Sequence, residues 1–68
     1  MREMPNIWFD SLTTFDDAVE QVEICLSVLK ENAKLSDFTN TNDKISYSNN
    51  VMYMKQLFER AETLARNN

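Results

Sequence analysis

The stretch LTTFDDAVEQVEICLSVLKENA, residues 12–33, decides the fold. Its apolar side chains recur at alternating spacings of three and four residues. This apolar seam consists of Leu12, Phe15, Val19, Val22, Leu26, Leu29 and Ala33. Such spacing is typical of one face of an α-helix. We therefore predict a helix over about residues 12–34, with the apolar seam as its core face.

The ends of this helix carry recognisable signals. Asp10 can cap the first turn directly, and Thr13 or Thr14 can cap it with an acid three residues later. Acidic side chains gather in the first turns and lysines in the last turns, which complements the helix macrodipole. The helix is expected to begin between Asp10 and Thr14 and to end near Lys34 or Leu35.

A second helix is predicted over about residues 47–66, with a start as early as Asn42 also open. Its apolar side chains repeat the same spacing at Val51, Met54, Phe58, Ala61 and Ala65. Residues 35–47, LSDFTNTNDKISY, are rich in turn-forming Ser, Thr, Asn and Asp and are predicted to connect the helices. We expect Phe38 to pack back onto the helices. Thr41, or a residue within 46–48, is expected to cap the second helix.

Two helices of similar length with a polar connection favour an antiparallel hairpin, so the fold class is all-α. Residues 1–68 are expected to form one small domain, with residues 1–10 as an N-terminal arm. The arm contains an apolar group, Ile7, Trp8 and Phe9. These side chains either fold back over the helices or anchor a partner, because aromatic residues bury large areas in both settings.

Size and composition favour a binding protein over an enzyme. A chain of 68 residues with one cysteine cannot form an internal disulfide, and with no histidine and no glycine it lacks the usual zinc ligands and phosphate-binding loops. We predict no catalytic residues, no cofactor and no metal. The net charge of −4 disfavours nucleic acid and anionic membranes as partners. Cys25 as a free thiol fits a reducing cytoplasm.

The helices carry more apolar side chains than a lone hairpin needs. The surplus positions are Ile24, Val28, Met52, Leu57 and Leu64. A helix with two apolar faces usually has two neighbours. The sequence therefore predicts a homo-oligomer, most simply a dimer that forms a four-helix bundle.

The predicted partner-binding residues combine aromatic anchors, an acidic strip and surplus apolar positions. They are Trp8, Phe9, Asp16, Glu20, Glu23, Ile24, Val28, Met52 and Tyr53. The acidic strip is interpreted first as a solvated helix face, with docking of a basic partner or a divalent ion as alternatives. Cys25 is interpreted as a small core residue. The methionine-rich region around Tyr53 is either core or an adaptable binding groove.

In overall plan the chain resembles small helical co-chaperones of secretion systems and small phage-encoded inhibitors of host proteins. This resemblance, together with the composition, predicts a non-enzymatic interaction module that acts as an adaptor, inhibitor or co-chaperone. The alternative is an oligomer that binds a small ligand in a pocket between protomers, near the arm and the connection.

Overall fold

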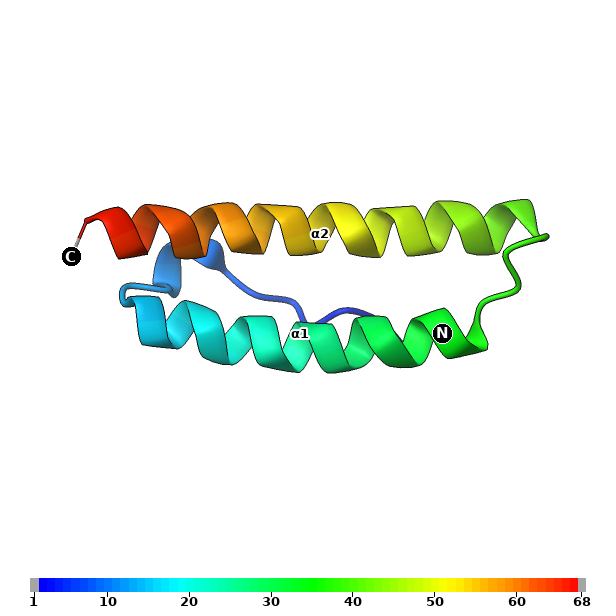
Figure 1. The fold of residues 1–68 in the computed structure, drawn as a ribbon, viewed down its shortest axis with the longest axis horizontal. Coiled ribbons are helices and arrows are strands. Elements are labelled where there is room, and N and C mark those ends of the chain that lie inside the picture. Colours follow the sequence, from blue (N-terminus) through cyan, green and yellow to red (C-terminus); the bar gives the residue numbers. More distant parts are fainter. Residues whose placement is uncertain (1, 68) are drawn as a thin grey trace.

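The computed structural model describes residues 2–67, and every regular element within them is helical. A short 3-10 turn, η1 (Phe9–Ser11), precedes two α-helices, α1 (Phe15–Leu35) and α2 (Thr41–Arg66). The helices run antiparallel and form a rod with extents of 43 × 15 × 15 Å (Figure 1). The predicted all-α antiparallel hairpin is confirmed.

Helix α1 begins where one of the expected caps is placed. The Thr14 hydroxyl oxygen accepts a hydrogen bond of 3.1 Å from the backbone N–H of Asp17, which satisfies one free donor of the first turn. The helix ends at Leu35, with Lys34 in its last turn. The C-terminal end is as predicted, and the first helical residue, Phe15, lies one position after the predicted limit, Thr14, which is the cap.

Helix α2 begins at Thr41, six residues before the predicted start at 47, so the connection is residues 36–40 rather than 35–47. Asn40 is the cap, because its side-chain oxygen accepts a hydrogen bond from the Asp43 backbone N–H. Phe38 is 46% exposed and does not pack into the core as expected. Its ring instead packs edge-to-face with that of Tyr47, with centroids 5.2 Å apart.

The buried face of α1 is turned by about one residue from the predicted seam. Ala18, Cys25 and Asn32, spaced seven residues apart, are fully buried, whereas Phe15 and Leu26 of the seam are 38% and 43% exposed. One residue corresponds to about 100° around a helix. The seam residues of α1 therefore lie toward one edge of the helix–helix contact, with Val22 and Leu29 still partly buried against the core, and small residues occupy its centre.

The α2 core is formed by Met54, Leu57, Ala61 and Leu64, together with Leu12 from the segment before α1. The prediction that Val28, Leu57 and Leu64 are surplus is wrong, since each is at least nine-tenths buried. Phe58, predicted to be core, is 51% exposed. Met54 and Ala61 are buried as predicted.

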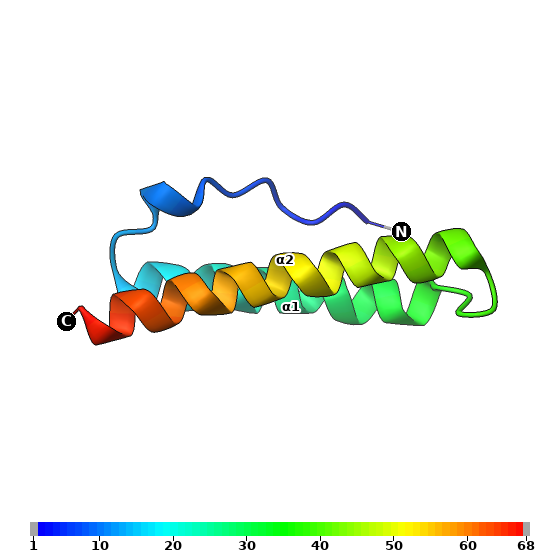
Figure 2. The same cartoon turned by 90° about the horizontal axis from the view of Figure 1, so that it is seen from above.

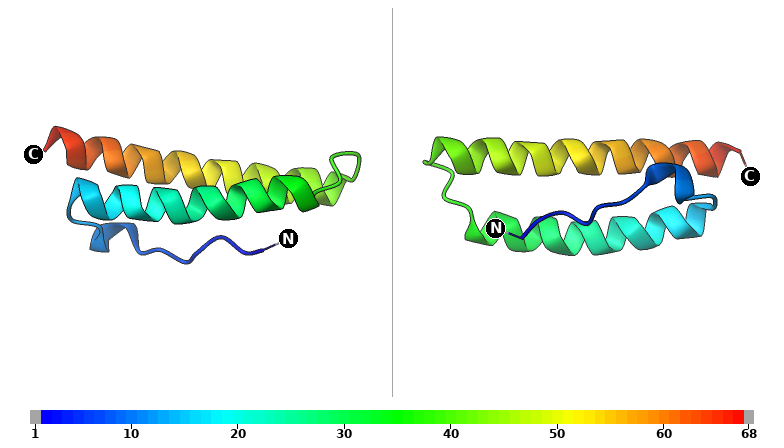
Figure 3. Two further views of the ribbon diagram at one scale, coloured as in Figure 1. Left: turned by 60° about the horizontal axis from the view of Figure 1, so that its bottom comes forward. Right: turned by 180° about the vertical axis from the view of Figure 1, so that it is seen from behind.

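The arm forms a third layer over one side of the hairpin. Residues 2–8 run along the two helices, and the view from behind shows them crossing the line between α1 and α2 (Figures 2 and 3). Met4, Ile7 and Phe9 pack against the core, and the Phe9 ring lies 5.5 Å from that of Tyr53. The expected fold-back is confirmed for Ile7 and Phe9, and Met4 packs there as well.

The side of the hairpin away from the arm carries most of the predicted seam. On α2, Tyr53 binds the arm and Arg60 binds Leu12 in the segment before α1, and they precede the core residues Met54 and Ala61 by one position. Phe58, four positions after Met54, turns the other way by about 40°. On α1, Glu31 likewise pairs with Arg2 of the arm and precedes the buried Asn32 by one position. The surface of α1 on the other side of Asn32 therefore faces away from the arm.

We call this uncovered surface the open face. It is formed by Phe15, Val19, Val22, Leu26, Leu29 and Ala33 of α1 with Val51 and Phe58 of α2. All eight side chains remain partly or largely exposed.

Candidate functional site

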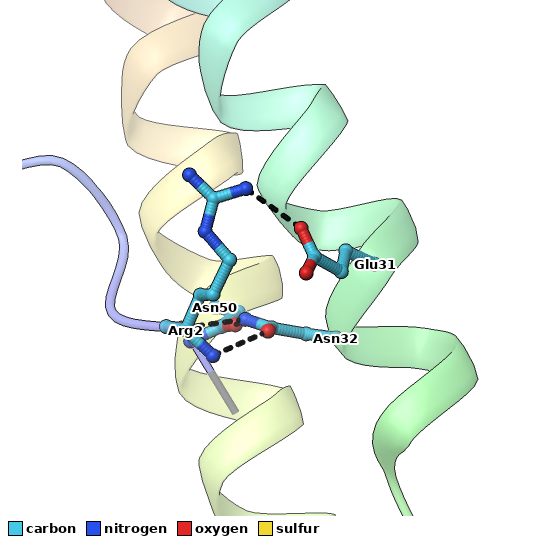
Figure 4. A network of polar contacts seen from close by, with 4 residues as sticks. All are labelled: Arg2, Glu31, Asn32 and Asn50. Atoms are coloured by element: carbon cyan, nitrogen blue, oxygen red, sulfur yellow. Dashed lines mark hydrogen bonds and ion pairs between the residues drawn. The ribbon is translucent and has the colours of Figure 1, made fainter.

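A buried amide fixes the beginning of the arm. Asn32, on α1, has no exposed surface, and its side-chain oxygen accepts a hydrogen bond of 2.8 Å from the backbone N–H of Arg2 (Figure 4). Its Nδ2 donates to the backbone oxygen of Arg2 at 2.8 Å and to Oδ1 of Asn50 on α2 at 2.7 Å. Asn32 thus binds one arm residue through both backbone groups and ties the arm to both helices.

The middle of the arm is held by Tyr53 on α2. The phenol donates a hydrogen bond of 2.6 Å to the backbone oxygen of Pro5 and accepts one of 3.1 Å from the backbone N–H of Ile7. Burial raises the pKa of Tyr53, the hydrogen bond from Ile7 opposes that rise, and nearby Cys25 adds to it. Tyr53 therefore stays neutral and can both donate and accept at neutral pH.

The end of the arm is fixed around η1. The Trp8 carbonyl oxygen accepts hydrogen bonds from the backbone N–H of Ser11 at 3.0 Å and from its hydroxyl at 2.7 Å. Further on, Arg60 Nη2 donates to the backbone oxygen of Leu12 at 2.9 Å. The backbone on both sides of Trp8 is thereby constrained.

Trp8 itself points away from the protein, with 74% of its surface exposed. Its neighbours Ile7 and Phe9 are partly buried against the core. Of the two predicted aromatic anchors, Phe9 is engaged by Tyr53 and Trp8 is left accessible. An indole held outward on a fixed backbone is an unusual use of the largest apolar side chain.

The other predicted partner-binding residues fall into three groups. Ile24 and Met52 are 44% and 55% exposed, Val28 is buried, and Tyr53 is occupied by the arm. Val28 can therefore not contact a partner of the folded hairpin, and the prediction for it is wrong. The remaining assignments stay predictions.

The acidic strip of Asp16, Glu20 and Glu23 is exposed along the first half of α1. Among residues 2–67, no group of three or more His, Cys, Asp or Glu side chains is placed to hold a metal ion. The strip is a solvated face that complements the N-terminal end of the helix dipole. Its use as a docking strip for a basic partner stays a prediction.

Cys25 is fully buried in the core, as predicted, and burial raises the pKa of its thiol. A protonated, inaccessible thiol is a poor nucleophile. A hollow of about 490 Å³ over the outer surface of α1 is lined by Glu23, Leu26, Ser27, Lys30, Glu31 and Lys34. Because a single helix lines it, this hollow is an open depression and does not enclose a ligand.

Within the described part of the chain, neither helix combines the length and apolar character needed to cross a bilayer. No protein-family model, curated protein or solved structure matches the chain. The side chains themselves are therefore the basis for a functional assignment.

Proposed function

We propose that this protein is a small, non-enzymatic protein–protein interaction module that acts as an adaptor, inhibitor or co-chaperone. The observation that carries this proposal is the exposure of Trp8 on a backbone held at both sides. Tryptophan is among the residues most enriched at binding hot spots. Because the arm is already ordered, a partner that takes up the indole loses little backbone entropy on binding.

The charges near Trp8 indicate the kind of partner. Asp10 lies in η1, two residues after Trp8, and Asp16 and Asp17 are in the first turn of the following helix, so the sequence that follows the accessible indole is acidic. A complementary surface has an apolar pocket bordered by lysine or arginine side chains. Such charges would increase the association rate and orient the complex.

The test uses a photo-reactive phenylalanine analogue at position 8 in the source cell, with the same analogue at position 45 as the control. Ile45 is 55% exposed and lies on α2. A protein cross-linked from position 8 and not from position 45 is the expected result. The purified partner should then bind Trp8→Ala at least about 30-fold more weakly, the usual effect of a tryptophan hot spot. Equal binding by Trp8→Ala, or no position-specific cross-link, contradicts the proposal.

The small-ligand alternative requires a pocket between two protomers. It stays a prediction, and no feature of the single chain favours it over protein binding.

A further inference from the structure

The open face is an apolar surface that no segment within residues 2–67 covers fully, although two of its members, Val22 and Leu29, also pack against the core. Its most exposed members are Phe15, Leu26 and Phe58, at 38%, 43% and 51%. Figure 1 views the hairpin from this side, with the arm behind the helices. Large exposed apolar patches on small proteins mark interaction sites.

We infer that the open face binds the open face of a second copy of this chain, giving a two-fold symmetric dimer in which α1 packs antiparallel against α1. The inference goes beyond the proposed function, because it concerns the side of the hairpin opposite the arm that carries Trp8. It rests on the charges around Leu26, on the size of the face and on the total exposed surface.

The charges around Leu26 are self-complementary. Glu23 precedes Leu26 by one turn and Lys30 follows it by one turn, and all three line the same open depression. In an antiparallel pair of α1 helices whose two-fold axis passes between Leu26 and Ser27, Glu23 of each copy lies opposite Lys30 of the other. An interface that repeats itself across a two-fold axis needs this kind of arrangement, since every contact occurs twice.

The other two-fold arrangement is electrostatically worse. An axis parallel to the rod would place α1 of one copy against α2 of the other. Asn32 faces Asn50 within the hairpin, so nine residues back along α1 and nine forward along α2 bring Glu23 level with Glu59. Two carboxylates are then at the same level where the preferred arrangement has Glu23 opposite Lys30, and like charges at one level disfavour the complex.

The dimensions fit a dimer interface. A rod of 43 by 15 Å presents a side of about 650 Å² in projection, close to the roughly 800 Å² per partner of a standard interface. The chain exposes 4914 Å², compared with about 4,450 Å² for a compact monomer of 8.0 kDa. Pairing two open faces would remove this excess and leave both arms, with both Trp8 side chains, on the outside.

Sedimentation velocity from about 1 µM to about 1 mM tests the inference, with a matched pair of variants on α1. Leu26 and Ile24 are 43% and 44% exposed, but only Leu26 lies on the open face. We expect a dimer for the wild type and for Ile24→Glu. Leu26→Glu should raise the dissociation constant at least 10-fold while its circular dichroism spectrum remains helical.

Charge exchange then tests the geometry. Glu23→Lys should weaken the dimer several-fold, and the double variant Glu23→Lys/Lys30→Glu should restore it to within about two-fold, since each pair is reversed but kept. A wild-type monomer at the highest concentration would overturn the inference and leave the open face to a different protein. Equal weakening by Ile24→Glu and Leu26→Glu would overturn the assignment of the face. A tighter dimer with Glu23→Lys would overturn the α1–α1 pairing.

Discussion

Replacing Asn32 by alanine should uncouple the arm from the hairpin. The substitution removes three hydrogen bonds, two to the Arg2 backbone and one to Asn50. At about 1 kcal/mol for each bond, the loss is about 3 kcal/mol. Alanine has a higher helix propensity than asparagine, which offsets about 0.5 kcal/mol of this loss. The expected net cost is about 2.5 kcal/mol, a large part of the roughly 3–10 kcal/mol typical of a chain of this length.

The experiment is a double-mutant cycle with a chain that lacks residues 1–3. In the shortened chain only the bond to Asn50 remains, so Asn32→Ala should cost about 0.5 kcal/mol, and the coupling energy should be about 2 kcal/mol. Urea unfolding followed at 222 nm measures both values. With a slope of about 1 kcal/mol per molar urea, the midpoint in the longer chain shifts by about 2–3 M. All chains carry Leu26→Glu, so that association does not contribute.

Asn49 supplies the control for this cycle. It is an exposed asparagine on the same helix as Asn50, and its replacement by alanine should leave stability unchanged or slightly higher. The same cost for Asn32→Ala in the longer and the shortened chain would refute the role assigned to the amide. So would a cost in the longer chain no larger than that of the control.

Three further outcomes are expected. Leu57→Ala should lower the free energy of unfolding by about 2–5 kcal/mol because Leu57 is fully buried, whereas Phe58→Ala should lower it by less than about 1 kcal/mol in the monomer. Chemical denaturation of both variants measures these values, and equal losses would contradict the assignment of Leu57 to the core. Tyr53→Phe removes the acceptor of the Ile7 N–H, so amide hydrogen exchange at Ile7 should become at least about 10-fold faster while exchange in the core of α1 stays the same. Unchanged exchange at Ile7 would show that the phenol does not hold the arm. Burial raises the pKa of the Cys25 thiol above its usual 9.0 on folding. The contribution of this thiol to stability is therefore complete below pH 9 and is lost as the pH rises further. The fall in the unfolding midpoint at high pH should be smaller in Cys25→Ala than in the wild type, and identical pH profiles would contradict this.

The helices and the capping of α1 could be predicted because local signals determine them. Thr14 precedes Asp17 by three residues, and the apolar spacing continues without a break from there to Ala33. The start of α2 could not be predicted in the same way. Asparagine and threonine favour turns and helix caps alike, so the run from Asn40 onward fits both a connection and a capped, solvent-exposed first turn.

The position of the buried face of α1, turned by about one residue from the apolar seam, could not be predicted for a different reason. Hydrophobic periodicity gives most weight to large side chains, and these form the seam that ends on the open face. The centre of the helix contact is made by Ala18, Cys25 and Asn32, which are small or polar. Periodicity gives an asparagine no weight as a core residue. Its partners, the Arg2 backbone and Asn50, are far away in sequence, so the hydrogen bonds by which Asn32 holds the arm can be recognised only in the three-dimensional structure.

The pairing of Asn32 with Asn50 also restricts how the two helices can slide past each other. Apolar stripes with a seven-residue repeat stay complementary after a shift of two turns, so hydrophobic contact alone leaves several alignments close in energy. In the antiparallel hairpin, a shift of seven residues in one direction would set Asn32 against Leu57, and a shift of seven residues in the other direction would set Asn50 against Cys25. In either case an amide at the helix contact would lose its partner, at about 1–3 kcal/mol for each unsatisfied group. One polar pair therefore selects a single alignment of the hairpin and discriminates against the slipped ones.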